Sequence, residues 1–154
     1  MRGPSAGPVL YTPAVILVSF DVGSRTIGVA TAHRSLGLAT PQFTLARVGV
    51  KRDVAALVER VITPEVTALV VGLPVKNDGQ EGRSARLARQ IGDALGEATG
   101  LPVHYQDESY STVEAETRLR EAGYDARQMK ALVDQAAAAV ILEDWLAEHP
   151  QETP

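Results

Sequence analysis

An aspartate closes the first apolar run of this chain, and two glycines follow it closely. The aspartate is Asp21 and the glycines are Gly23 and Gly28, after which the chain turns apolar again. A short apolar run bounded by glycine is typical of a buried strand, and Gly23 supplies the backbone freedom that a sharp turn needs. The pattern predicts two antiparallel strands, residues 14–21 and 25–32, with Asp21 at the turn between them.

The remaining sequence predicts three more extended segments and four helices. In chain order they are strand 36–46, helix 53–61, strand 67–72, helix 83–99, strand 102–107, helix 111–123 and helix 126–148. Pro41 indicates an edge position or a bulge in the first of them, while Asp53 and Ser111 are predicted to cap two of the helices. Three meandering strands followed by α/β crossovers predict an α/β fold with a mixed five-stranded sheet flanked by helices.

Composition limits the classes to which the protein can belong. The 154 residues are enough for one domain with a full core. We assign residues 14–148 to that domain, residues 1–13 to a disordered extension and residues 149–154 to a flexible tail. The chain has no cysteine, which suits a reducing cytoplasm and excludes thiolate chemistry. Since no apolar run approaches the roughly 20 residues of a membrane helix, a cytoplasmic protein without a membrane segment is expected.

Charge bears on the choice of partner. The formal net charge of −4 counts mildly against nucleic-acid binding, which usually shows as a basic domain. Acids gathered at a metal site lower the net charge without covering the surface, however. The cations are twelve arginines and only three lysines, and arginine suits planar, two-point contact with phosphate. A nucleic-acid partner therefore stays open.

Three acids stand out by their positions. Asp21 follows the first strand, Glu108 follows the fifth, and Asp134 lies in the last helix among small residues. Ligands of such sheets bind beyond the carboxyl ends of the strands, and carboxylates gathered there repel one another unless a cation binds. Mg²⁺ and Mn²⁺ take oxygen ligands, and two ions about 4 Å apart can activate a water for phosphoryl transfer. Each acid also has a structural alternative, as a turn brace, a helix-dipole partner or a solvent-facing residue.

A loop with several glycines follows the fourth strand and leads into a helix with three regularly spaced arginines. Amide groups at a helix start can hold phosphate, and arginines three residues apart fan over about a third of a helix surface. The alternative for these arginines is a solvated helix face. The candidates for contact with nucleic acid are Arg25, Lys76, Asn77, Arg83, Arg86 and Arg89, and the structural turn residues are Gly23, Gly28, Gly72 and Pro74.

Four groups of motifs together resemble one known family. They are residues 21–30, residues 70–74 with 78–82, residues 107–115 with 121–123, and Asp134 with residues 137–138 and 141–142. They follow one another in the right order between residues 15 and 146, and they resemble the YqgF (RuvX) family, RNase H-like proteins related to the RuvC Holliday-junction resolvases. The resemblance implies a five-stranded RNase H-like fold and a divalent-metal nuclease.

The same resemblance implies a set of site residues and a cofactor. The acids that it makes catalytic and metal-binding are Asp21, Glu108 and Asp134, with Asp107 as a further candidate ligand. The implied cofactor is Mg²⁺ or Mn²⁺, as two ions, and the implied products carry a 5′-phosphate and a 3′-hydroxyl. Two positions depart from the family: Ser109 replaces a frequent Arg, and Ala32-His33 replaces a frequent Ser-Asp. Loss of the Arg predicts weaker phosphate contact or a changed substrate preference.

The expected activity is hydrolysis of phosphodiester bonds, with processing of the 5′ end of pre-16S ribosomal RNA in ribosome biogenesis as the leading role. One alternative is a Holliday-junction resolvase or a single-strand DNA or RNA nuclease in repair and recombination. Another is a non-catalytic nucleic-acid-binding regulator. A sugar kinase or ATPase of the actin–hexokinase type shares the Asp-x-Gly turn but needs two such domains. Resolving a symmetric junction favours a homodimer, whereas trimming a single strand does not require one.

Overall fold

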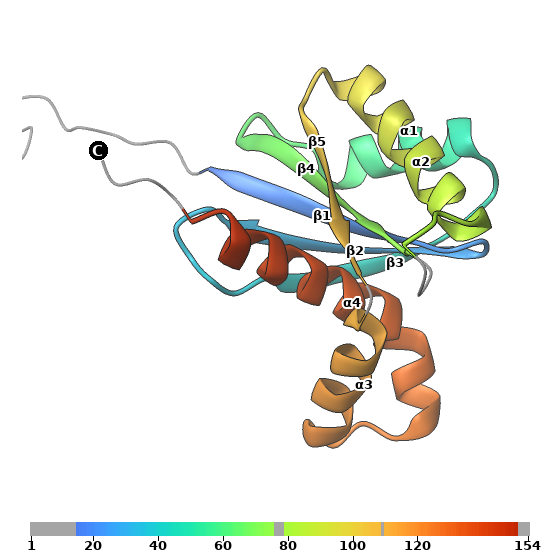
Figure 1. Ribbon diagram of the computed structural model, residues 1–154, viewed down its shortest axis with the longest axis vertical. Coiled ribbons are helices and arrows are strands. Elements are labelled where there is room, and N and C mark those ends of the chain that lie inside the picture. The colour runs from blue at the N-terminus through green and yellow to red at the C-terminus, as the bar shows by residue number, and fades with distance from the viewer. Residues whose placement is uncertain (1–14, 76–78, 109, 151–154) are drawn as a thin grey trace, which may run out of the picture.

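Five strands form one mixed sheet at the centre of the molecule, with helices on both faces (Figure 1). The computed structural model describes residues 15–75, 79–108 and 110–150. The elements are β1 Ile16–Val22, β2 Thr26–His33, β3 Thr40–Ala46, α1 Val50–Val61, β4 Val66–Leu73, α2 Arg83–Thr99, β5 Val103–Asp107, α3 Ser111–Glu121 and α4 Ala126–Glu148. The sheet order is β3-β2-β1-β4-β5, with β1, β2 and β3 antiparallel and β1, β4 and β5 parallel. The predicted α/β fold is confirmed.

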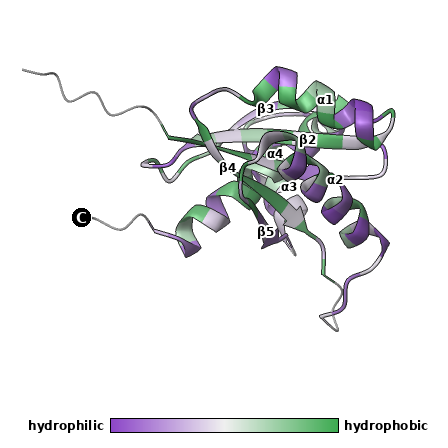
Figure 2. Cartoon of the chain, turned by 90° about the horizontal axis from the view of Figure 1, so that it is seen from above, coloured by the Kyte–Doolittle hydropathy of each residue, from purple (hydrophilic) through white to green (hydrophobic). Residues whose placement is uncertain are grey.

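The two faces of the sheet carry side chains of different size. Phe20, Ile27 and Leu69 point to one face, where they pack with α1 and α2 into the largest apolar core. On the other face, Ala30 of β2 packs against the small residues Ala138 and Ala139 of α4. Successive strand residues point to opposite faces, so small residues at alternate positions let α4 lie close to the sheet. Figure 2 shows hydrophobic strands next to helices α1 and α2, which carry hydrophilic residues.

Helix α3 and the first turns of α4 form a helical hairpin that projects from the sheet (Figure 1). The two helices pack through a small cluster that includes Leu119 of α3 and Val140 of α4. Gly123 ends α3 with a backbone φ of 92°, and the next residue, Tyr124, donates its N–H to the Leu119 carbonyl at 3.1 Å. Gly123 thus holds the position after the helix at which glycine is common.

Strand β3 lies at the edge of the sheet, as Pro41 indicated. Its pairing with β2 shifts register between Val29 and Ala30, which is the irregularity expected at a proline that cannot donate to the ladder. The strand is shorter than predicted, because it begins at Thr40 rather than at residue 36. The pairing with β2 begins only there, opposite Thr31.

Helix α1 begins at Val50, three residues before the predicted start, so the prediction that Asp53 is its N-cap was wrong. Gly49 holds the N-cap position. The Asp53 carboxylate lies in the first turn and accepts the backbone N–H groups of Val48 at 2.9 Å and Gly49 at 3.4 Å. The carboxylate therefore does satisfy donors that precede the helix, but from inside it.

The predicted capping box at Ser111 was also wrong. Tyr110 is the N-cap of α3, without a side-chain cap, and the Ser111 hydroxyl instead donates to the Glu108 carbonyl oxygen at 3.0 Å. A capping box is present at the start of α4, where Asp125 and Gln128 exchange side-chain and backbone hydrogen bonds at 2.8 and 2.9 Å. A local motif was thus overridden at α3 by a contact to the preceding turn.

The described part of the chain contains no helix that is both long and apolar enough to cross a membrane. The predicted extension, residues 1–13, and the tail beyond residue 150 lie outside the described residues. The domain boundaries at residues 14 and 148 stay a prediction.

Candidate active site

The carboxyl ends of β1, β4 and β5 meet at one edge of the sheet, where Asp21 and Gly72 stand close to one another. Asp21 is the second-to-last residue of β1 and lies on the face that α4 covers. Its partner across the β1–β2 ladder is Gly28. On its other side the β1–β4 pairing runs up to Phe20 and Val71, which sets Gly72 level with Asp21. Asp21 is therefore flanked by glycine on both neighbouring strands.

Glu108 reaches Asp21 through the space that Gly72 leaves. A Cβ atom at position 72 would collide with Oε2 of Glu108 and would lie 2.5 Å from Cδ1 of Ile141. The carboxyl groups of Glu108 and Asp21 share a hydrogen bond, which lowers the pKa of Asp21 and raises that of Glu108. The Oε2 atom of Glu108 is buried and has no hydrogen-bond partner among the described residues. Two acids from separate strands are thus brought into direct contact, with one carboxyl oxygen left unsatisfied.

Asp134 is brought to the same edge by Gly28. A Cβ atom at position 28 would collide with the backbone carbonyl of Asp134 and would lie 2.6 Å from the backbone nitrogen of Gln135. Only glycine lets the α4 backbone come this close to β2. The side chain of Asp134 accepts a hydrogen bond from the Thr26 hydroxyl, with 2.5 Å between the two oxygens. The three acids predicted from the sequence therefore lie at one end of the sheet.

Electrostatics at this edge are unfavourable for the two acids in contact. Burial first, and then the charge of Asp134, raise the pKa of Asp21 to about 6, against the opposing effect of its hydrogen bond with Glu108. Burial, the charge of Asp21 and the hydrogen bond to it raise the pKa of Glu108 to about 9, with a further contribution from Asp107. Near neutral pH the pair therefore shares a proton, because two half-buried like charges in contact cannot both ionise easily.

These donors fit a hard divalent cation in their chemistry. Carboxylate oxygens are the ligands that Mg²⁺ and Mn²⁺ prefer, and the buried Oε2 of Glu108 is an acceptor that lacks a donor. A cation would replace the shared proton and reverse the raised pKa values. As they stand, no three Asp, Glu, His or Cys side chains of the described residues are grouped closely enough to hold one ion together. The acids that would hold it are Asp21, Glu108 and Asp134.

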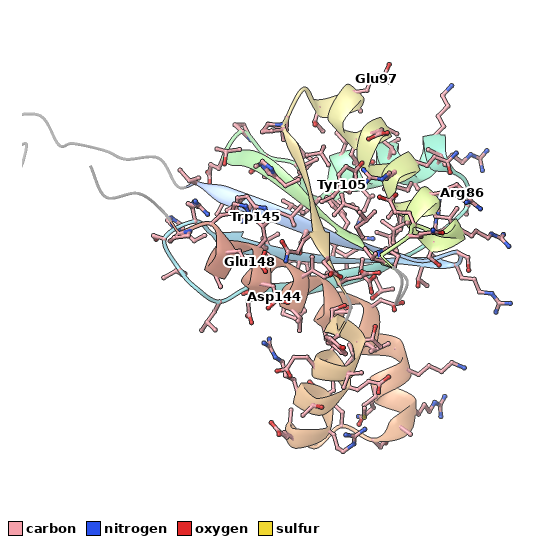
Figure 3. All side chains as sticks on the ribbon, viewed as in Figure 1. Arg86, Glu97, Tyr105, Asp144, Trp145 and Glu148 are labelled. Carbon is pink, nitrogen blue, oxygen red and sulfur yellow. The ribbon has the colours of Figure 1, made fainter. Side chains whose placement is uncertain are left out.

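The predicted nucleic-acid contacts divide into three groups. Arg25, Arg83 and Arg86 are exposed, and the two on α2 stand at the helix end nearest the carboxyl edge. Figure 3 shows Arg86 at that end of α2 and Glu97 at the opposite end. Arg89 is engaged elsewhere, because it forms two 2.6 Å bonds with Glu81 and lies over the Tyr105 ring. Lys76 and Asn77 lie outside the described residues, as does Ser109, while Asp107 is exposed at the end of β5.

The predicted turn residues have distinct places. The N–H of Gly23 donates to the Thr26 carbonyl at 2.8 Å, which closes the β1–β2 turn. The prediction that Gly28 and Gly72 are turn residues was wrong, because both lie within strands, where their missing side chains make room for the acids. Pro74 lines a small hollow of about 210 Å³ beside the start of α2, together with Arg83.

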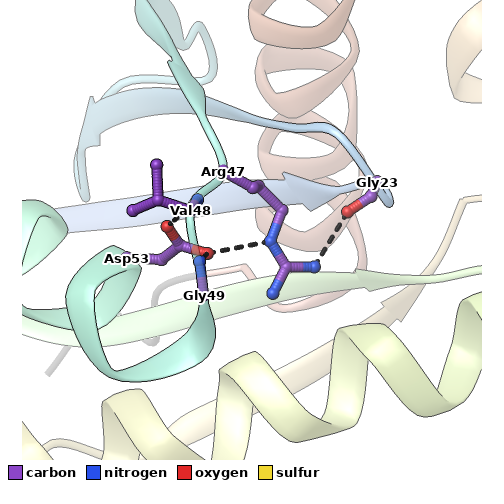
Figure 4. Close-up of polar contacts among 5 residues, drawn as sticks. All are labelled: Gly23, Arg47, Val48, Gly49 and Asp53. Carbon is purple, nitrogen blue, oxygen red and sulfur yellow. Dashed lines mark hydrogen bonds and ion pairs between the residues drawn. The ribbon is translucent and has the colours of Figure 1, made fainter.

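A buried ion pair that the sequence analysis missed braces the turn after Asp21 (Figure 4). Arg47, between β3 and α1, donates to the Gly23 carbonyl oxygen and to the Asp53 carboxylate, both at 3.0 Å. Its side chain is 9 % exposed and that of Asp53 is fully buried. Burial by itself would raise the pKa of Asp53, but hydrogen bonds from Val48, Arg47 and Gly49 outweigh it and hold the pKa below its usual value. Because Arg47 and Asp53 join separate elements, no local pattern marks them.

The sheet topology is that of an RNase H-like fold. The structure of T. thermophilus RuvC in complex with a Holliday junction substrate is similar to this chain at 15 % identity, with a TM-score of 0.54. The similarity covers 88 % of this chain and 96 % of that one. At this level of identity the similarity establishes the fold.

The family can be stated more narrowly. The model of the RuvX family, described as Holliday junction resolvase, matches residues 15–148, and the chain belongs to this family. A relative from Anaeromyxobacter sp. (strain Fw109-5) is 44 % identical over 129 residues, which are 84 % of this chain and 94 % of the relative. One from Picosynechococcus sp. (strain ATCC 27264 / PCC 7002 / PR-6) is 41 % identical over 133 residues, which are 86 % and 92 %. Both relatives are named "Putative pre-16S rRNA nuclease". The predicted family and the enzyme class, a nuclease, are confirmed.

Proposed function

We propose that this protein is a divalent-metal-dependent nuclease whose acids are Asp21, Glu108 and Asp134. The observation that carries the proposal is the contact between Asp21 and Glu108, two half-buried carboxyl groups with raised pKa values, one of which has a buried oxygen without a partner among the described residues. Such a pair destabilises the metal-free fold, so its presence calls for a functional reason. Membership in the RuvX family supports hydrolysis of phosphodiester bonds as that function.

The acids of this chain would hold Mg²⁺ or Mn²⁺, as two ions, at the carboxyl edge of the sheet. When bound, such ions activate a water and stabilise the leaving oxygen in phosphoryl transfer. Both other acids act on Asp21, Glu108 through a hydrogen bond and Asp134 through its charge. Asp21 would therefore take the central place among the acids that hold the ions. Asp107, exposed at the end of β5, is a further ligand candidate.

The start of α2 is the proposed contact for the nucleic-acid backbone. Arg83 and Arg86 lie in the first turns of this helix, where positive side chains are unfavourable because the helix dipole is positive at that end. The same end suits an anion such as phosphate. Two arginines at this helix end, next to the edge of the sheet where the acids lie, are best explained by a bound phosphate, which both the arginines and the helix start would stabilise. Arg25, on the β1–β2 turn, would extend this contact.

The 5′ end of pre-16S ribosomal RNA is the proposed substrate, in the cytoplasm, because curated relatives at 41–44 % identity carry that name. A Holliday junction is the second candidate, favoured by the description of the family model. The two differ in symmetry: a junction cut on both sides calls for a two-fold dimer, and a single strand does not.

The test compares the protein with Asp21→Asn and with Glu97→Gln, which removes an exposed carboxylate at the far end of α2. Each is incubated with RNA that carries the pre-16S leader, with single-stranded DNA and with a four-way junction, in Mg²⁺ or Mn²⁺. We expect the wild type and Glu97→Gln to cut the RNA and Asp21→Asn to cut nothing. Paired symmetric nicks in the junction alone would replace the RNA assignment by resolvase. Full activity of Asp21→Asn would refute the assignment of the acids.

A further inference from the structure

Hydroxyl groups from neighbouring strands hold one short stretch of α4 against the sheet. Ser19 of β1 donates to the Ala138 carbonyl oxygen at 2.7 Å and is fully buried. Thr44 of β3 donates to Oε1 of Gln135 at 3.2 Å. These two bonds fix the helix relative to the strands on either side of β2, and neither ends on an acid of the candidate site.

Thr26 of β2 also bonds to α4, but its acceptor is the side chain of an acid of the candidate site. Its hydroxyl donates to Oδ2 of Asp134 at 2.5 Å, in a half-buried position. The backbone of Asp134 is already fixed by its contact with Gly28, so the hydroxyl of Thr26 is not needed to place the helix. What the backbone contact leaves undetermined is the rotamer of the Asp134 side chain, since a carboxylate can still turn about its χ angles.

Two opposing interactions decide this rotamer: repulsion between the acids and the hydrogen bond from Thr26. Asp134 and Asp21 repel one another, as the effect of Asp134 on the pKa of Asp21 indicates. In the metal-free protein the Asp134 carboxylate would lower its energy by turning toward solvent. A hydrogen bond to a charged acceptor is worth about 1.5–3 kcal/mol, which is enough to oppose such a rotation.

We infer that Thr26 is a positioning residue, which holds the Asp134 carboxylate beside Asp21 before any cation binds. The inference rests on the proposed nuclease function for its consequence, but not for its geometry. Partners that orient a metal ligand in this way typically contribute 10–100-fold to metal affinity or activity. The position therefore calls for a hydroxyl rather than merely a β-branched side chain.

The experiment uses variants that separate the hydroxyl from the shape of the side chain. Thr26→Val keeps the shape and removes the donor, Thr26→Ser keeps the donor, and Thr44→Val removes a hydroxyl that touches α4 but no acid. We expect Thr26→Val to lose about 10–100-fold in Mn²⁺ affinity by calorimetry and in kcat. Thr26→Ser and Thr44→Val should stay within about threefold of the wild type, since the donor to Asp134 is intact in both. If Thr26→Val does not fold, Thr26→Ala carries the same comparison.

A second measurement reads the side chain directly in the metal-free protein. Scalar couplings in NMR report the χ1 rotamer of Asp134, which should be single in the wild type, Thr26→Ser and Thr44→Val, and averaged in Thr26→Val. An unchanged rotamer in Thr26→Val would overturn the inference, and so would equal losses of Mn²⁺ affinity in Thr26→Val and Thr44→Val. If the wild type neither binds Mn²⁺ nor cleaves, the proposed function fails, and the rotamer alone then decides whether Thr26 positions Asp134.

Discussion

Two clusters of ionisable side chains lie near the end of β1, and they are built in opposite ways. In the first, Asp21 and Glu108 are two acids in contact that share a proton near neutral pH, and one carboxyl oxygen has no partner among the described residues. In the second, Arg47 and Asp53 are opposite charges, and the Asp53 carboxylate accepts three hydrogen bonds. Burial acts against ionisation in both, yet it raises the pKa values of the first cluster and is overcome in the second.

The difference teaches which cluster serves the fold and which serves a ligand. Arg47 joins the β3–α1 connection to the Gly23 carbonyl, so the second cluster fixes the turn that follows Asp21. The first cluster ties nothing that the sheet does not already hold. Like charges kept together in a low-dielectric edge are stabilised only when something positive joins them. The Arg47–Asp53 ion pair thus stabilises the turn next to the Asp21–Glu108 pair.

The largest effect should come from Glu108→Gln. In the metal-free protein Glu108 already carries a proton, and an amide can donate to Asp21 as the protonated carboxyl does. The free energy of unfolding should therefore be unchanged or higher. An amide is a far weaker ligand for a divalent cation, and the loss of several kcal/mol of metal-derived stabilisation corresponds to about 10³-fold in the cleavage rate. Urea denaturation and a single-turnover cleavage assay measure the two effects, and a lower stability of the variant would break the comparison.

In the Arg47–Asp53 cluster, Asp53→Ala should lower stability and leave cleavage nearly unchanged, the reverse of the effect expected for Glu108→Gln. This change leaves the Arg47 guanidinium buried without its partner and removes the acceptor for two backbone N–H groups, which should lower the free energy of unfolding by about 3–5 kcal/mol. The cleavage rate per folded molecule should change little at a permissive temperature. Urea denaturation with Glu59→Ala, which removes an exposed acid of the same helix, gives the control. Equal stability of the two variants would contradict the role assigned to the ion pair.

The pH dependence of stability should also have opposite signs in the two clusters. Asp53 has a lowered pKa in the folded protein, so its contribution is present above the unfolded value of about 4 and is lost as pH falls through the folded pKa. Glu108 has a pKa raised to about 9, so the folded state keeps a proton that the unfolded state releases. Its contribution falls as pH rises from about 4.5 to about 9, by at most about 1.4 kcal/mol per pH unit for one proton.

Urea denaturation of metal-free protein from acid to pH 9 separates these two dependences. Glu108→Gln should flatten the decline between pH 4.5 and 9 and leave the acid limb unchanged. Asp53→Ala should flatten the acid limb alone. A wild-type stability that stays constant between pH 5 and 9 without metal would mean that the two acids do not share a proton.

The fold was largely predictable because its signals are local. The apolar run before Asp21, Pro41 at an edge strand and Gly100 after α2 each act on their own neighbours in sequence, and Gly100 ends that helix with a φ of 72°. Predictions failed where a side chain has a distant or competing partner. Ser111 donates to the Glu108 carbonyl instead of capping α3. Asp53, inside α1, forms an ion pair with Arg47, which precedes the helix.

The acids of the candidate site could be predicted from the sequence, but the distances at which they approach one another could not. Topology alone brings the carboxyl ends of β1 and β5 to one edge, so Asp21 and Glu108 could be expected there. How closely Asp21 and Glu108 meet depends on Gly72, and how closely Asp134 approaches them depends on Gly28; both roles follow from the β1–β4 and β1–β2 registers. Sequence patterns do not determine which residue of one strand faces which residue of the next. Thr26 was missed for the same reason, since its partner lies 108 residues away.

The smallest effect should come from an ion pair with better geometry than either cluster. Arg89 grips Glu81 through two 2.6 Å bonds, but the side chains are 42 % and 36 % exposed. Solvent screens such pairs, and their net contribution to stability is small. Glu81→Ala should therefore leave the melting temperature unchanged within error, although it removes the same kind of partner from an arginine as Asp53→Ala does. Thermal unfolding of both variants at low and high salt tests whether burial, rather than pairing alone, determines how much the Arg47–Asp53 pair contributes to stability. A loss of stability in Glu81→Ala as large as in Asp53→Ala would mean that pairing alone suffices.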